Sequence, residues 1–173
     1  VDQPFEQGAS IDLEKLAETV AVAVRMMDNV VDVSNFPLEQ QEHEAKAKRR
    51  IGLGITGLAD ALIMCGARYG AASAVQLTET WMATIQRAAY MASVDLAKEK
   101  GAFPLFDAEK YAATGHASTL DDDIKAAIAE HGIRNALLTS VAPTGTPSSQ
   151  PSTRPSTQPS AQPTSMPTVQ PSA

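Results

Sequence analysis

A proline recurs every four residues at the carboxyl end of the chain, and this repeat limits how much of the chain can fold. Mainly Ser, Thr, Gln and Ala separate the prolines, which are Pro147, Pro151, Pro155, Pro159, Pro163, Pro167 and Pro171. The repeat has almost nothing apolar to bury, so we expect residues 147–173 to be disordered and biased towards polyproline II. A linker, a ligand for a proline-binding domain and an O-glycosylated stalk are the functions open to it. Of the 173 residues, only 1–146 can build a core.

Two long helices are predicted in residues 1–146. The first covers 12–33, where apolar residues recur at helical spacing and form one stripe, Leu13, Leu16, Val20, Val24, Met27 and Val31. The second covers 72–100, has a broad buried face that includes Val75 and Trp81, and stops at Gly101. Helical periodicity therefore predicts a mainly α structure with at most one or two short strands.

Three shorter helices complete this prediction. A highly charged, exposed helix is expected over 38–50, and an apolar one over 58–65. A further helix is expected to be capped by Thr119 and to end at Gly132, with its isoleucines pointing inward. The Asp121–Asp123 triplet falls in its first turn, where negative charge is favoured, so we interpret it as part of the cap and not as a metal site.

The remaining charged and reactive residues are expected to have structural roles. Asp28 and Asp32 lie near the end of the first helix, which we expect to fray into solvent. The basic run 46–50 is interpreted as the solvated end of the second predicted helix. Cys65 lies in an apolar helix with no histidine nearby, so we expect a buried small hydrophobic residue and not a nucleophile.

Three glycines have the spacing of a dinucleotide-binding loop. Gly52, Gly54 and Gly57 satisfy G-x-G-x-x-G, but that motif needs a strand before its first glycine. Residues 42–50 are strong helix formers, so we interpret the glycines as a turn that lets helix 58–65 pack closely on its neighbour.

The stretch from Asn135 to Thr146 organises the rest of the chain. Residues 136–141 are mostly apolar and predict a short buried strand, which opens into the small-residue turn Pro143-Thr144-Gly145-Thr146. Backbone N–H groups and hydroxyls in such a turn can bind a phosphate. An ordinary Pro-Gly turn is the alternative, and the residues alone leave both open.

Charge and composition exclude several classes of function. The net charge of −6 argues against a nucleic-acid partner, which would need clustered Lys and Arg. One cysteine rules out an internal disulfide and a cysteine-ligated zinc site, and it favours a reducing, cytoplasmic location. The sequence has no apolar run long enough to span a membrane and no signal-peptide pattern, so no membrane partner is expected. It starts at Val1, which suggests a piece of something longer.

Four landmarks in order resemble the large chain of ribonucleotide reductase. They are Val24–Asp32, Arg49–Asp60, Ser93–Pro104 and His131–Thr146. The Ala-Pro-Thr-Gly-Thr ending is more similar to the adenosylcobalamin (vitamin B12)-dependent class than to the di-iron class. The resemblance implies an oxidoreductase that makes deoxyribonucleotides for DNA synthesis. Residues 1–146 would then be a mainly α fragment of that family's ten-stranded α/β barrel.

Function carries over from the resemblance at one motif only. It implies that the phosphates of a ribonucleoside di- or triphosphate contact Ala142, Pro143, Thr144, Gly145 and Thr146. Adenosylcobalamin as cofactor and a thioredoxin-type dithiol as reductant are implied for the parent enzyme.

The chain lacks the family's catalytic cysteines, and Cys65 matches none of them, so we expect it to be inactive alone. It departs from the family after Thr146, which suggests a truncation, a fusion or a faulty gene model. The alternative is a non-catalytic helical module whose proline-rich tail is a linker or interaction segment.

Overall fold

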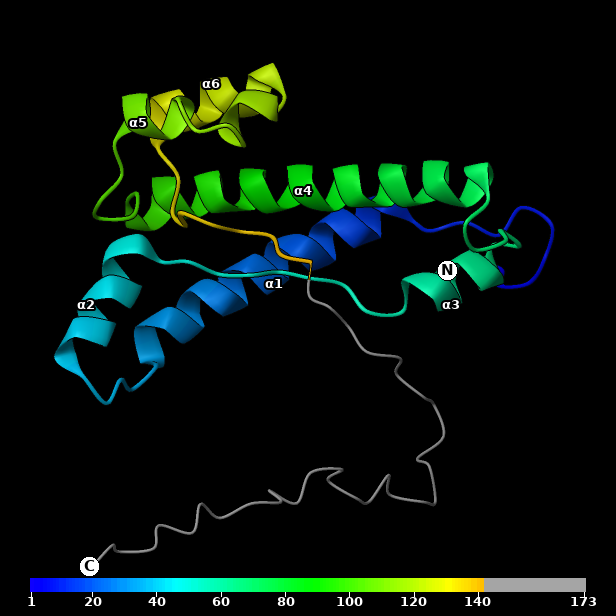
Figure 1. The fold of residues 1–173 in the computed structure, drawn as a ribbon, viewed down its shortest axis with the longest axis horizontal. Coiled ribbons are helices and arrows are strands. Elements are labelled where there is room, and N and C mark those ends of the chain that lie inside the picture. Colours follow the sequence, from blue (N-terminus) through cyan, green and yellow to red (C-terminus); the bar gives the residue numbers. More distant parts are fainter. Residues whose placement is uncertain (142–173) are drawn as a thin grey trace, which may run out of the picture. The chain divides into compact units, whose positions relative to one another are not determined.

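The computed structural model describes residues 1–141, so the predicted phosphate contacts at 142–146 and the proline repeat lie outside the described residues. Within this range the chain is mainly helical, as predicted, and forms no regular strand (Figure 1). The elements in chain order are α1 (Leu13–Val33), α2 (Glu39–Lys48), α3 (Leu58–Met64), α4 (Ala72–Lys100), α5 (Ala108–Ala112), the 3-10 turn η1 (Ala117–Thr119) and α6 (Asp122–His131).

Helices α1 and α4 form the framework. Their axes point in roughly the same direction, and both helices run from right to left in Figure 1. The bounds of both confirm the predictions. Helix α1 begins where the Asp12 carboxylate accepts a hydrogen bond from the Lys15 N–H at 3.0 Å, which satisfies one of the free donors of the first turn. Helix α4 ends at Gly101, whose φ of 86° favours glycine.

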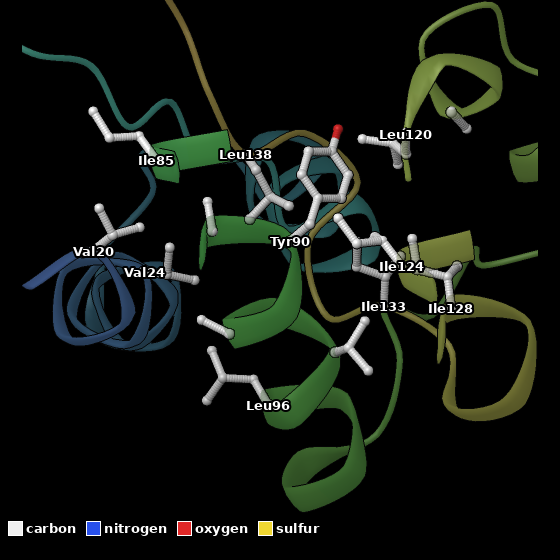
Figure 2. Close-up of a cluster of buried hydrophobic side chains, with 14 of the residues drawn as sticks. Val20, Val24, Ile85, Tyr90, Leu96, Leu120, Ile124, Ile128, Ile133 and Leu138 are labelled. Carbon is white, nitrogen blue, oxygen red and sulfur yellow. The ribbon is translucent and has the colours of Figure 1, made fainter. Parts of the chain in front are cut away.

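The main core lies where α1, α4 and α6 meet the segment after α6. Figure 2 shows side chains of this cluster, with Leu138 among residues from α1 and α4. As predicted, Val20 and Val24 turn inward from α1, and Ile124 and Ile128 from α6. A smaller cluster gathers under α3, where Trp81 is buried against Leu62 with Cys65 half-buried beside them.

Two details of the helices differ from the predictions. Thr119 does not cap α6: it ends the turn η1, where its hydroxyl donates to the carbonyl of His116, and Asp121 occupies the cap position. Val75 is 59% exposed, since the core takes up the neighbouring Ala74 instead. A shift of one residue rotates a helical side chain by about 100°, which is enough to leave the buried face.

The side of α1 opposite the core is also apolar. Its outward residues Val22, Met26, Val30 and Val33 are 52–76% exposed. A helix that is apolar on two opposite faces is typical of one covered from both sides. Among residues 1–141, no helix combines the length and the hydrophobicity that crossing a membrane requires.

Candidate functional site

The structure describes the segment that leads directly to the predicted phosphate loop. Residues 136–140 lie beside 48–53: Ile51 N–H donates to the Leu137 carbonyl at 2.9 Å, and Leu53 N–H to the Leu138 carbonyl at 2.7 Å. Ser140 N–H donates back to the Leu53 carbonyl at 2.9 Å. The two segments run parallel but form only one bridge, Leu53 to Thr139.

The predicted buried strand over 136–141 is therefore only partly correct. Leu138 is 2% exposed, whereas Leu137 and Val141 are 57% and 89% exposed. Side chains alternate between faces along an extended segment, so with a core on one side only, every second residue is left outside. Within residues 1–141, the backbone of this segment pairs with residues 48–53 alone, and this is too little pairing for a regular strand.

Two of the three glycines allow residues 48–53 and 136–140 to lie close together. A Cβ on Gly52 would lie 2.9 Å from the Ser140 Oγ, and one on Gly54 would lie 3.0 Å from the Ser140 carbonyl oxygen. Gly57, with φ of 77°, begins α3. The glycines follow α2 and no strand, so the interpretation against a dinucleotide loop agrees with the structure. The tight packing, however, is against residue 140 and was not predicted.

Asn135, which begins the segment, is completely buried and connects three helices. Its side-chain amide donates to Asp28 Oδ1 on α1 at 3.0 Å and to the Arg49 carbonyl, at the end of α2, at 3.1 Å. Its Oδ1 accepts from the Ser93 hydroxyl on α4 at 2.9 Å, and its own N–H donates to that hydroxyl oxygen at 3.1 Å. All the hydrogen-bonding groups of the side chain are thus used.

Asp28 and Arg49 form the centre of this network, contrary to the expectation of solvated ends for both helices. Asp28 is 0% exposed and Arg49 is 4% exposed. Arg49 Nε donates to Asp28 Oδ1 at 2.8 Å, Nη2 to the Asp28 carbonyl at 2.8 Å, and Nη1 to Asp32 Oδ1 at 2.7 Å. A buried charge is tolerable only when paired in this way.

The backbone of Arg49 is also unusual. Its φ of 47° places it in the left-handed region, which is costly for a residue with a Cβ. This conformation ends α2 and turns the chain into the extended segment that follows. The side-chain bonds to Asp28 and Asp32 hold the residue there, so one arginine links the end of α2 to α1.

Two further cations approach the other oxygen of Asp28. Arg134 Nε lies 3.3 Å from Asp28 Oδ2, and Lys100 Nζ lies 3.6 Å from it. Burial alone would raise the pKa of Asp28, but the hydrogen bond and charge of Arg49, with Arg134 and Asn135, outweigh it and hold the pKa below its usual value. Asp28 is therefore a carboxylate that stays ionised inside the fold.

Other candidate residues lie outside this network. Arg87 on α4 pairs with the Asp121 and Asp123 carboxylates, so the acidic triplet contributes an exposed ion pair between α4 and α6. Among the described residues, no three His, Cys, Asp or Glu side chains are grouped as metal ligands. A groove of about 400 Å³ opens beside the Leu53–Thr139 bridge, with Met82, Ile85 and Glu79 of α4 in its wall.

Comparisons with known proteins agree with the resemblance seen in the sequence. The chain is 42% identical over 136 residues to a vitamin B12-dependent ribonucleoside-diphosphate reductase of Mycobacterium tuberculosis, covering 79% of this chain and 17% of that protein. It is 36% identical over 139 residues to the enzyme of the same name from Thermoplasma acidophilum, covering 80% and 16%. A ribonucleoside-diphosphate reductase subunit alpha of Chlamydia trachomatis is 32% identical over 161 residues, with 80% and 15% covered.

The chain thus spans about one sixth of the length of these relatives. A family model described as the ribonucleotide reductase barrel domain matches residues 3–170, a range that continues past Thr146 into the proline repeat. Because this match takes in nearly the whole chain, the chain belongs to the ribonucleotide reductase barrel-domain family.

Proposed function

We propose that residues 1–146 are a segment of the catalytic barrel of a ribonucleotide reductase, and that Ala142–Thr146 contact the substrate phosphates. The observation that carries the proposal is the anchoring of the segment before them. A fully buried asparagine, four backbone hydrogen bonds to residues 48–53 and two closely packed glycines hold residues 135–140 in one register. Such rigid support is what a loop needs to present backbone N–H groups to an anion.

The names of the relatives favour ribonucleoside diphosphates as substrates over triphosphates, since the proteins of M. tuberculosis and T. acidophilum are ribonucleoside-diphosphate reductases. The outward side of α1 is apolar and exposed. This supports the proposal that the chain is a segment of a larger domain, whose other parts would cover that side. A thioredoxin-type reductant and a cytoplasmic location belong to the same proposal. The names of the relatives and the apolar outward side of α1 both favour a reductase segment over an independent helical module.

Adenosylcobalamin, which starts radical formation in the B12-dependent class, is too large for the two grooves beside α4. The groove beside Leu53 has a volume of about 400 Å³, and a second groove along Leu62, Ala74 and Val75 has about 580 Å³. Pockets of roughly 300–1,000 Å³ suit drug-sized ligands, and a corrin with its nucleotide tail is far larger. Neither groove has a histidine in its wall. The proposal therefore assigns the cofactor to no described residue of this chain.

Phosphate binding can be tested by NMR on the full 173-residue chain. Two or three hydrogen bonds to a charged group, less the cost of ordering the loop, give an affinity of roughly millimolar. Cytidine 5′-diphosphate should shift the amide signals of Thr144, Gly145 and Thr146, whereas cytidine should not. Gly145→Val should abolish the shifts, because a branched side chain blocks close backbone approach.

Gly115→Val is the matched control, since no atom lies within 4 Å of a Cβ at that position. It should leave the shifts unchanged. If cytidine 5′-diphosphate moves no amide signal of the loop at tens of millimolar, residues 143–146 form only a turn in this chain, and the proposal is wrong.

A further inference from the structure

Asn135 lies where α1, α4 and the end of α2 come together. One side of its amide group is bonded to α4 through Ser93, and the other to α1 and α2 through Asp28 and the Arg49 carbonyl. These partners are 42, 107 and 86 residues away along the chain. A single side chain therefore fixes the start of the segment relative to three helices.

The segment that follows has few other attachments to those helices. Ala136 N–H donates to the Lys48 carbonyl at 3.1 Å, and pairing with Ile51 and Leu53 continues to Ser140. Side chains in an extended segment alternate between faces, so a slip of one residue would expose Leu138 and bury Leu137. The hydrogen bonds of Asn135 oppose this slip, because they specify one position along the segment and apolar contacts do not.

We propose that Asn135 is a positioning residue for the phosphate loop: its amide sets the register of residues 136–140 and thereby the phosphate affinity of residues 142–146. The inference rests on the proposed function of that loop. Asn135 is completely buried, so it acts on the phosphates through the chain that connects it to the loop. Ser93, which accepts from the Asn135 N–H and donates to its Oδ1, shares this role.

Asparagine suits this position better than its closest substitutes. Aspartate would replace the two donors with acceptors and bring a second carboxylate to about 3.0 Å from Asp28 Oδ1. Alanine would leave the Ser93 hydroxyl, the Arg49 carbonyl and Asp28 each without one partner. The described residues contain no buried side-chain nitrogen or oxygen without a partner, so such a loss has no ready compensation nearby.

The test compares Asn135→Ala with Ile128→Ala in the full chain. Ile128 is 6% exposed and belongs to the same core, but it lies on α6 and makes none of these hydrogen bonds. Both variants should unfold at a lower urea concentration, so stability alone does not separate them. Cytidine 5′-diphosphate affinity, measured from the amide shifts of Thr144–Thr146, should fall about fivefold or more in Asn135→Ala only, the lower end of coupling between linked sites.

Hydrogen exchange provides a reading without ligand. The Ser140 N–H donates to the Leu53 carbonyl, and the Leu53 N–H donates to the Leu138 carbonyl. Hydrogen exchange at these two amides should accelerate more in Asn135→Ala than in Ile128→Ala. If Asn135→Ala does not fold, Ser93→Ala replaces it, because it removes a single hydroxyl and should show the same selective effects more weakly.

The outcomes separate the two proposals. Equal affinities for wild type and Asn135→Ala would refute the positioning role and leave the phosphate loop standing. An equal loss in Ile128→Ala would show that affinity follows overall stability, which also refutes it. If the wild type binds no diphosphate, the loop proposal is wrong and this inference falls with it, whatever hydrogen exchange shows.

Discussion

Replacing Asp28 by leucine tests whether the buried ion network holds the fold together. Arg49 is 4% exposed and would lose the acceptor of its Nε, keeping only Asp32 and the backbone carbonyl of residue 28. Arg134 and Lys100 would lose the carboxylate that they approach. Removing one partner of a buried pair costs about 3–5 kcal/mol, since the remaining charge stays in a poorly solvated place.

That loss is a large share of the stability of a small domain, which is about 5–15 kcal/mol. Asp28→Asn should cost less than Asp28→Leu, because its carbonyl can still accept from Arg49 and Asn135. The double variant Asp28→Leu/Arg49→Met should recover part of the loss, since apolar side chains of similar size often replace a buried pair without penalty.

Urea denaturation followed by far-UV circular dichroism measures these differences. Arg25→Ala is the control, because the Arg25–Glu99 pair also attaches α1 to another helix, α4, but both side chains are about half exposed, at 48% and 51%. Exposed pairs contribute little to stability. The reasoning is refuted if Asp28→Leu lowers the free energy of unfolding by no more than Arg25→Ala does, or if the double variant is no more stable than Asp28→Leu.

Three further predictions concern the core, the glycine contact and pH. Leu138→Ala should lower the free energy of unfolding by about 2–5 kcal/mol, whereas Leu137→Ala, 57% exposed, should stay within about 0.5 kcal/mol; urea denaturation showing equal effects would contradict the described burial. Gly54→Ala should destabilise by about 1 kcal/mol or more, because the new methyl would lie 3.0 Å from a backbone oxygen, whereas Gly115→Ala has open space and should be neutral or stabilising in thermal unfolding. The folded pKa of Asp28 lies below the unfolded value of about 3.9, so its contribution to stability is complete above about pH 5 and is lost as the pH falls through the folded pKa. Urea titrations at several pH values in this range should show a smaller fall in the free energy of unfolding for Asp28→Asn than for the wild type. An equal fall in both would exclude the Asp28 carboxyl as the source of the pH dependence.

The helices could be predicted from sequence because their causes are local. The bounds of α1 and α4 follow from apolar spacing, the Asp12 cap and the stop at Gly101, which all act within a few residues. The family could also be predicted, since it rests on motifs in a fixed order. The Thr119 cap was wrong because Thr119 belongs to the 3-10 turn η1, where its hydroxyl donates to the His116 carbonyl and caps no N–H group of α6.

The network around Asp28 could not be predicted, because its partners are far apart in the chain. Asp28, Arg49 and Asn135 each look like ordinary polar residues near helix ends or in a loop, where exposure to water is the common outcome. They become buried partners only once α1 and α4 pack and bring residues 28, 93 and 135 together. The sequence by itself determined which stretches are helical and which family they resemble, through short-range sterics and periodicity. Only the tertiary structure decided which charges leave water, since burying them is favourable only when all their partners arrive at the same place.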